Sequence, residues 1–240
     1  MLFAAGLGTR LQPFTLSHPK ALAVVNNQTL LQRNLTYLQQ NGIDEVVINT
    51  HHFAEQIEKY LEENECFGMK IRLIFEKDIL ETGGGLLNAR EYFTEDFVVM
   101  NADILTKFSL KKLIDFHQKY KPIASLAVSK RSSSRKLLFT EEMRLQGWRN
   151  LTTEEDIIVN PRLKLHEYAF SGIHILRSDI FDKITEEGKF SIMKSYMRLM
   201  KENYILGYDH TGDYLIDVGK PQSILAVSYT HLRAHETLRY

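Results

Sequence analysis

The sequence contains a single cysteine, Cys66, and no excess of charge of either sign. One cysteine excludes an internal disulfide framework and a zinc site built from several cysteines. The 30 Lys and Arg residues balance the 30 Asp and Glu residues, so no overall field would recruit nucleic acid or an anionic membrane. Any partner must therefore be recognised at a local site.

Long apolar runs are also missing. None approaches the roughly 18 residues that a membrane span needs, and no charged segment followed by an apolar one precedes Gly6. We therefore expect a soluble cytoplasmic protein without a membrane partner. The 240 residues suit one large domain, which we place at residues 1–226. Residues 227–240 show no period and resemble translated adapter sequence, which predicts a non-native or disordered tail.

Apolar runs alternate with amphipathic segments along the first half of the chain. Buried strands are predicted at residues 45–49, 70–75, 97–100 and 123–128. Between them, helices are predicted after the N-cap residue Thr29, at 54–63 and after the N-cap residue Ser109. This order, with crossovers of this length, is typical of a parallel sheet. The sequence therefore predicts an α/β protein, a Rossmann-like three-layer α/β/α sandwich with a mostly parallel central sheet.

The pattern changes in the second half. Two short apolar segments, residues 137–139 and 145–148, flank a polar turn and predict a small antiparallel insert. Residues 168–176 then return to the sheet, and Gly172 inside that strand indicates a close approach by backbone or ligand. A helix is predicted at 190–203, followed by strands at 204–208 and 214–216.

The segment from Gly6 to Lys20 carries the clearest functional signal. Gly6 and Gly8 follow an apolar run and can expose successive backbone N–H groups to an anion. Thr9 adds a hydroxyl donor, and Arg10 adds a planar charged group that suits phosphate oxygens. Lys20 supplies a second cation. The segment thus predicts a phosphate site, and the alternative is a tight turn with surface charges.

Two familiar phosphate motifs do not match this segment. Leu11 stands where the dinucleotide-binding fingerprint needs its third glycine. No Gly-Lys-Ser/Thr sequence follows at the spacing of a P-loop. The glycine turn must therefore belong to another class of phosphate site.

Further polar groups follow two of the predicted strands. Asp103 comes after the strand at 97–100, and Asp217 comes after the strand at 214–216. Acids at strand ends lie where open α/β sheets bind ligands, and Mg²⁺ takes one or two carboxylates together with substrate oxygens. Capping of the next turn is the alternative role for Asp103. A second glycine run, residues 83–85, could admit a flat ring or a phosphate, or be only a flexible loop.

The complete string from Gly6 to Lys20, G-x-G-T-R-L-x-P-x-T-x-x-x-P-K, resembles the signature of the sugar-1-phosphate nucleotidyltransferases. Four further segments appear in the order of that family: 81–85, 101–103, 170–173 and 216–221. The resemblance covers about residues 1–225. Within the family, the chain resembles bacterial enzymes of the N-acetylmuramate-1-phosphate uridylyltransferase type and the mannose-1-phosphate guanylyltransferase-like enzymes. The resemblance implies the nucleotide-diphospho-sugar transferase fold.

The resemblance also implies an activity and a set of site residues. A nucleoside triphosphate would condense with a sugar 1-phosphate, with Mg²⁺ as the cofactor, to give a nucleotide-diphosphate sugar and pyrophosphate. Arg10 and Lys20 would be catalytic, and Asp103 and Asp217 would hold the metal. Gly172 would border the sugar phosphate. The residues implied for nucleotide binding are Ala5, Gly6, Gly8, Thr9, Gly83, Gly84 and Asn101.

The sequence departs from the family in places that leave alternatives open. No Glu-Lys-Pro sugar-binding segment is found between residues 145 and 162, and Leu215 stands where an aromatic residue is common. UTP with an amino-sugar phosphate is favoured by resemblance alone, followed by GTP with a mannose- or heptose-type phosphate. Other readings are a silent nucleotide or sugar-phosphate binder, a glycosyltransferase, or a cytidylyltransferase acting on phosphocholine. Monomer and homodimer are both open.

Overall fold

The computed structural model describes residues 1–219. The chain divides into two units, and each is described by itself. Unit 1 contains residue 1 and residues 80–100 and 108–213, whereas unit 2 contains residues 2–79 and 101–107 and the described residues from 214 onward. The single domain expected at 1–226 stays a prediction. The expected tail at 227–240 lies outside the described residues.

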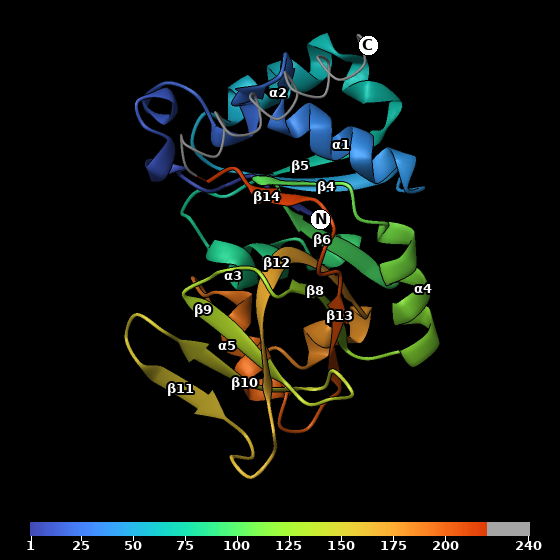
Figure 1. Cartoon of the computed structure of the whole chain (residues 1–240). Coiled ribbons are helices and arrows are strands. Elements are labelled where there is room, and N and C mark those ends of the chain that lie inside the picture. Colours follow the sequence, from blue (N-terminus) through green and yellow to red (C-terminus); the bar gives the residue numbers. More distant parts are fainter. Residues whose placement is uncertain (220–240) are drawn as a thin grey trace, which may run out of the picture. The chain divides into compact units, whose positions relative to one another are not determined.

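Three parallel strands form the sheet of unit 2. They are β1 (Leu2–Phe3), β4 (Glu45–Thr50) and β5 (Lys70–Phe75). Two helices, α1 (Leu30–Gln40) and α2 (Ala54–Glu63), lie on the same side of β4 and β5 (Figure 1). Along the chain α1 precedes β4, and α2 lies between β4 and β5. Each helix therefore lies on the crossover to a parallel strand, as expected from the sequence.

The limits of α1 follow from local chemistry. The Thr29 side chain accepts a hydrogen bond from the backbone N–H of Gln32 at 3.0 Å, which satisfies a free donor at the start of the helix. At the other end Gly42 has φ +80°, a conformation that ends helices at little cost only for glycine. The helix turns its leucines into the core; those below 4% exposure are Leu30, Leu31, Leu35 and Leu38.

The remaining elements of unit 2 are short. Four 3₁₀ turns are η1 (Thr9–Leu11), η2 (Phe14–Leu16), η3 (Lys20–Leu22) and η4 (Glu65–Gly68). Two small antiparallel pairs join β2 (Val24–Val25) to β3 (Gln28–Thr29) and β7 (Ile104–Thr106) to β14 (Leu215–Asp217). One buried cluster holds them together: Leu11, Ala23, Val25, Leu30, Leu105 and Val218. This cluster packs the glycine turn against the β7–β14 pair.

Unit 1 contains a mixed group of strands. β12 (His166–Leu176) runs antiparallel to β6 (Phe97–Asn101) and β8 (Ala124–Ser129), and β13 (Ile205–Asp209) runs parallel to β8. Its helices are α3 (Glu81–Asn88), α4 (Leu110–Tyr120) and α5 (Ile192–Leu199), with 3₁₀ turns η5 (Arg90–Tyr92) and η6 (Ser178–Asp182). Among residues 1–219 no helix has the length and apolarity required to cross a bilayer.

The antiparallel insert of unit 1 is present as predicted. β9 (Arg135–Phe139) and β10 (Leu145–Asn150) form a hairpin, and β9 also pairs with β12. A third strand, β11 (Glu155–Ile158), adds to the free edge of β10 and was not expected. The helix predicted at 190–203 is shorter than expected, because α5 covers only Ile192–Leu199.

Candidate functional site

The glycine turn in unit 2 starts from a fixed point. The backbone N–H of Ala4 donates to Oδ1 of Asn49 at 2.9 Å, and Asn49 is only 3% exposed. The Nδ2 of Asn49 in turn donates to Oε1 of buried Glu76 at 2.7 Å. Because both partners of Asn49 are buried with it, the amide orientation is determined. Asn49 therefore anchors the chain one residue before the predicted nucleotide-binding residue Ala5.

Gly8 gives the turn its shape. Its φ of +59° lies in the left-handed region, and its carbonyl accepts from the backbone N–H of Leu11 at 2.8 Å and from the Thr15 hydroxyl at 3.0 Å. A Cβ at this position would lie 2.9 Å from Cβ of Lys20. Only glycine therefore allows the turn to lie directly against Lys20.

The turn leaves hydrogen-bond donors unused. Gly6 and Thr9 are exposed, and within residues 1–219 the backbone N–H groups of Gly6 and Gly8 have no acceptor. Arg10, at the surface in η1, forms no ion pair with the described residues. Free N–H groups next to an unpaired guanidinium are the donors that an anion needs.

Lys20 and Asp103 meet in this unit although 83 residues separate them in the sequence. Lys20 Nζ contacts Oδ2 of Asp103 in an ion pair, with side-chain exposures of 14% and 21%. Asp103 follows β6, and its carbonyl accepts from the backbone N–H of Val218 at 2.8 Å. The proposed catalytic lysine and the first predicted metal ligand thus occupy one partly buried position.

Asp217 lies beside this pair because β14 is paired with β7, where Asp217 is opposite Ile104. Its Oδ1 accepts from the backbone N–H of Gly219 at 2.8 Å. A Cβ at Gly219 would lie 2.7 Å from that same oxygen and 2.7 Å from Nη2 of Arg10. Gly219 therefore gives the room in which the second predicted carboxylate and Arg10 approach each other. Its motif continues at 220 and 221, outside the described residues.

These contacts bring together most of the predicted site. Unit 2 holds the nucleotide-binding candidates Ala5, Gly6, Gly8, Thr9 and Asn101, the cations Arg10 and Lys20, and the carboxylates Asp103 and Asp217. Two contributors were missed in the sequence. Asn49 is a polar residue at the end of a buried strand, which is a recognisable signal, whereas the role of Gly219 depends on a contact with Arg10 that spacing does not reveal.

Gly83 and Gly84 lie in unit 1, inside α3 and not in an open loop. A Cβ at Gly83 would lie 2.2 Å from Phe190, and one at Gly84 would lie 2.2 Å from the carbonyl oxygen of Gly188. Both glycines are buried, and the N–H of Gly83 donates to the carbonyl of Phe190 at 2.8 Å. Close packing therefore explains these glycines, and their contact with a nucleotide stays a prediction.

Gly172 also lies in unit 1, within a bulge of β12. Its φ is +75°, and the register of β12 against β8 shifts between Phe170 and His174. The neighbouring Ser171 is fully buried, and its hydroxyl lies 2.7 Å from Nε2 of His210. The left-handed backbone of the bulge explains the glycine, and the close approach that the sequence indicates stays a prediction. Its role at a sugar phosphate stays a prediction.

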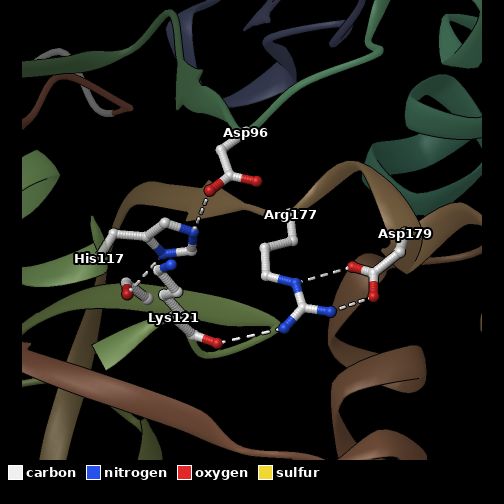
Figure 2. A network of polar contacts seen from close by, with 6 residues as sticks. Asp96, His117, Lys121, Arg177 and Asp179 are labelled. Carbon is white, nitrogen blue, oxygen red and sulfur yellow. Dashed lines mark hydrogen bonds and ion pairs between the residues drawn. The ribbon is translucent and has the colours of Figure 1, made fainter. Parts of the chain in front are cut away.

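A second polar network in unit 1 has the residue types of a catalytic triad (Figure 2). His117 Nδ1 lies 2.8 Å from the Ser125 hydroxyl, and Nε2 lies 3.4 Å from Oδ2 of Asp96. Burial lowers the pKa of His117, and Asp96 partly opposes this effect. Ser125, however, has no exposed surface, so no substrate can reach its hydroxyl. The arrangement is structural.

Arg177 extends this network beside α4. Its guanidinium binds both carboxylate oxygens of Asp179 and donates to the carbonyl of Lys121 at 3.2 Å (Figure 2). Lys121 ends α4 with φ +46°. The hydrogen bond from Arg177 to the Lys121 carbonyl therefore holds the C-terminus of the helix, and Asp179 orients the guanidinium. Asp96 immediately precedes β6, so the network lies at the N-terminal end of this strand.

Metal binding in unit 2 would rest on two carboxylates. No group of three or more His, Cys, Asp or Glu side chains in the described part of the chain is arranged to hold a metal ion by itself. Asp103 and Asp217 provide two carboxylates from adjoining strand ends. Mg²⁺ commonly binds through one or two carboxylates and completes its shell with water and phosphate oxygens. The donor set therefore fits Mg²⁺ bound together with a phosphate ligand.

Comparison with known proteins identifies the class to which this arrangement belongs. A glycine turn with two cations and two strand-end carboxylates is the arrangement expected of a phosphate site in an α/β protein. The family model described as "Nucleotidyl transferase" matches residues 1–234, and the chain belongs to this family.

Curated relatives are identical to the chain at about a quarter of the aligned positions. A mannose-1-phosphate guanyltransferase of Gibberella zeae is 26% identical over 236 residues, which are 97% of the chain and 64% of the relative. A UTP–glucose-1-phosphate uridylyltransferase of Synechocystis is 26% identical over 237 residues, 92% of the chain and 60% of the relative. The chain therefore spans less than two thirds of the length of these relatives.

Solved structures share the fold. HddC from Yersinia pseudotuberculosis, complexed with GMP-PN, has a TM-score of 0.77 at 21% identity, with 96% of the chain and 97% of that structure covered. A putative glucose-1-phosphate thymidylyltransferase from Bacillus anthracis has a TM-score of 0.81 at 16% identity, with coverage of 95% and 93%. The predicted fold, that of the nucleotide-diphospho-sugar transferases, is confirmed.

Proposed function

We propose that the chain transfers a nucleotidyl group from a nucleoside triphosphate to a sugar 1-phosphate. An oxygen of the sugar phosphate forms a bond to the α-phosphorus while the bond from that phosphorus to the bridging oxygen breaks on the opposite side. Pyrophosphate leaves with the electron pair, and the product is a nucleotide-diphosphate sugar. The attacking phosphate is ionised at neutral pH, so positioning and charge neutralisation can supply the catalysis without a general base.

The observation that carries this proposal is the meeting of two cations, two carboxylates and a free glycine turn in unit 2. The N–H groups of Gly6 and Gly8 would donate to the triphosphate, and Arg10 would hold the leaving pyrophosphate. Lys20, which contacts Asp103, would neutralise the reacting phosphates. Each role uses a donor that is unpaired or is paired only within the site.

Mg²⁺ would be held by Asp103 and Asp217, whose carboxylates complete the set of charges. When bound, a divalent cation neutralises phosphate charge and orients the oxygens of the triphosphate. Lys20 would then exchange its contact with Asp103 for a contact with phosphate.

The relatives indicate the class of substrates and not one particular pair. The names of the relatives include guanylyl and uridylyl transfer, with mannose 1-phosphate or glucose 1-phosphate as acceptor. UTP with an amino-sugar phosphate is the alternative that sequence resemblance favours. We propose that the enzyme acts in the cytoplasm as a monomer or a homodimer, and its oligomeric state is to be measured directly.

Pyrophosphate release tests the proposal. The full chain is incubated with Mg²⁺ and each of GTP, UTP, CTP, ATP and dTTP, crossed with mannose, glucose, heptose and amino-sugar 1-phosphates. Lys20→Met and Asp217→Asn are measured beside a matched control, Lys70→Met, which removes an exposed lysine that also pairs with a carboxylate, that of Glu45. A lost electrostatic contact in a transition state lowers kcat by about 100- to 1,000-fold.

We expect release to require one particular pair of substrates, and we expect both site variants to lose activity with an unchanged melting temperature. Normal turnover in Asp217→Asn would overturn the metal assignment. Nucleotide binding by the folded wild-type protein without any product would instead support a silent binding relative. Phosphocholine is added to the panel, because product with CTP and phosphocholine would identify the alternative cytidylyltransferase.

A further inference from the structure

Unit 2 contains two asparagines that are almost completely buried. Asn34 in α1 is 1% exposed, and Asn49 in β4 is 3% exposed. Burial of an amide is costly unless its groups are hydrogen-bonded, and asparagine favours neither a helix interior nor a strand. An apolar side chain would fill either position at lower cost. The reason for each amide must therefore lie in its contacts.

Asn34 holds the backbone that carries the first predicted metal ligand. Its Nδ2 donates to the carbonyl of Ala102 at 2.7 Å. Ala102 is 5% exposed and lies in the turn before β7, next to Asp103. The N–H of Ala102 donates to the carbonyl of Phe3 at 3.0 Å. Both polar backbone groups of Ala102 are therefore bonded, one to α1 and the other to β1, which restrains the position of Asp103.

Asn49 has the equivalent position at the glycine turn. β1 pairs with β4 as far as Phe3, which lies opposite Asn49. The next N–H, that of Ala4, donates to the Asn49 side chain at 2.9 Å and not to a backbone carbonyl of β4. The Nδ2 of Asn49 donates to Glu76, which is 2% exposed. A buried side chain thus determines the direction in which the chain leaves β1 toward the turn.

The two anchored segments are also bonded to each other. The hydrogen bond from Ala102 to Phe3 joins the segment before the glycine turn to the segment before Asp103. The carbonyl of Asp103 in turn accepts from the N–H of Val218, the residue after Asp217, at 2.8 Å. One backbone network therefore connects the phosphate turn with both carboxylates, and each asparagine supports a different part of it.

We propose that Asn34 and Asn49 are positioning residues with separate tasks. Asn34 places the carboxylate of Asp103 for the metal ion, and Asn49 places the N–H groups of the glycine turn for the triphosphate. The inference rests on the proposed function and deepens it. Both asparagines are buried, so they act through the backbone and not by touching a ligand. Loss of one amide leaves the bond from Ala102 to Phe3 in place, so the other part of the site stays held.

Steady-state kinetics with the substrate pair selected by the pyrophosphate-release panel separates the two tasks. Asn34→Leu keeps the branched shape of the side chain and removes the donor to Ala102. At saturating triphosphate it should raise the Mg²⁺ concentration for half-maximal rate by about 10-fold, the effect typical of groups that orient a metal ligand. Its KM for the triphosphate should stay unchanged. Asn49→Leu removes the acceptor of the Ala4 N–H and should give the opposite pattern, with KM raised by about 10-fold.

Asn41→Leu is the matched control for a general loss of stability. The Nδ2 of Asn41 also donates to a backbone carbonyl, that of Tyr37 at 2.8 Å, but both residues belong to the end of α1. Both constants should keep their wild-type values in this variant. Neither constant depends on the fraction of folded protein, so a merely destabilised variant loses rate without a change in either. A shift in Asn41→Leu as large as that in Asn34→Leu would overturn the role of Asn34.

Ligand binding without turnover gives an independent readout. Mn²⁺ binding is followed by its electron paramagnetic resonance signal, and binding of inorganic tripolyphosphate by calorimetry, each without the other. Asn34→Leu should weaken Mn²⁺ binding alone, and Asn49→Leu should weaken tripolyphosphate binding alone.

A paired exchange tests whether Asn49 acts through its hydrogen bonds. Asn49→Asp alone places a second carboxylate beside Glu76 and should weaken tripolyphosphate binding. The double variant Asn49→Asp, Glu76→Gln reverses the bond between the two side chains and keeps an oxygen as acceptor for the Ala4 N–H. It should recover tripolyphosphate binding. Equal weakening in the single and the double variant would overturn the role of Asn49.

The remaining outcomes distinguish this inference from the proposed function. Equal shifts of both constants in Asn34→Leu and Asn49→Leu, or no shift in either variant, would overturn the separate tasks while pyrophosphate release by the wild type supports the activity. Absence of release by the wild type would overturn the proposed function, and the two binding titrations then decide. Selective losses would support the positioning roles, whereas equal losses, or a wild type that binds neither probe, would overturn them.

Discussion

His174 makes the stability of unit 1 depend on pH. It lies in β12, is 3% exposed, and its Nδ1 is 3.0 Å from the hydroxyl of Tyr196, which has no exposed surface. Burial lowers the pKa of His174 from 6.5 to about 3, because the charged imidazolium would lose its hydration. The folded protein therefore keeps this ring neutral throughout the physiological range.

The sign and size of the effect follow from linkage. Below pH 6.5 the unfolded chain binds a proton on His174 that the folded chain cannot, so acid favours unfolding. The contribution is fully present above pH 6.5 and is lost as the pH falls toward 3. Each unit in this window removes about 1.4 kcal/mol of unfolding free energy, so a change from pH 7.5 to 5.0 removes about 2 kcal/mol.

Urea unfolding at pH 7.5 and 5.0 measures this loss. Wild type is compared with the double variant His174→Phe, Tyr196→Phe, which removes the titrating group without leaving the tyrosine hydroxyl unpaired. The wild type should lose about 2 kcal/mol more than the variant between the two pH values. Burial also lowers the pKa values of His117 and His210, but both proteins retain these groups. An equal loss in the two proteins would refute the reasoning.

Three further substitutions separate packing from function. Gly84→Ala would force a Cβ to 2.2 Å from the carbonyl oxygen of Gly188, so the melting temperature should fall, with a loss of about 1–3 kcal/mol. Gly219→Ala would displace Arg10 and should lower pyrophosphate release while leaving the melting temperature unchanged. Thr29→Ala removes the N-cap of α1 and should cost about 1 kcal/mol in urea unfolding.

Each of these has a direct control. A Cβ at Gly6 meets no atom within 4 Å, so Gly6→Ala should leave the melting temperature unchanged where Gly84→Ala lowers it. Full activity in Gly219→Ala would contradict the close approach of Arg10 and the second carboxylate. Thr29→Ser keeps the hydroxyl and should retain the stability of α1; an equal loss in Ser and Ala variants would argue against capping.

Elements governed by local chemistry were predictable from the sequence. Thr29 and Ser109 cap α1 and α4 because a side-chain oxygen needs only an N–H three residues ahead. The β2–β3 hairpin was missed although Asn26 and Asn27 carry the local signal, with φ values of +48° and +62° that suit a two-residue turn. The prediction failed there because each strand has only two residues.

Elements governed by distant partners were not predictable. α5 begins later than its periodic sequence suggests, since Ser191 is its N-cap and the carbonyl of Phe190 accepts from the N–H of Gly83 in α3. β7 exists only because β14 pairs with it more than 100 residues later. The same limit applies to the candidate site. Residue types indicated Lys20 and Asp103 separately, but no spacing rule predicts that the two side chains touch.

The division of the chain has a consequence for its synthesis. Unit 2 uses residues 101–107 and the strand β14, yet residues 108–213 of unit 1 are translated between them. A nascent chain that ends at residue 213 therefore lacks the partner of β7 and the second predicted carboxylate, so the predicted site cannot form before β14 is translated. Limited proteolysis of ribosome-stalled chains should cut within 101–107 until β14 emerges. The predicted site can therefore assemble only after unit 1 has been translated in full.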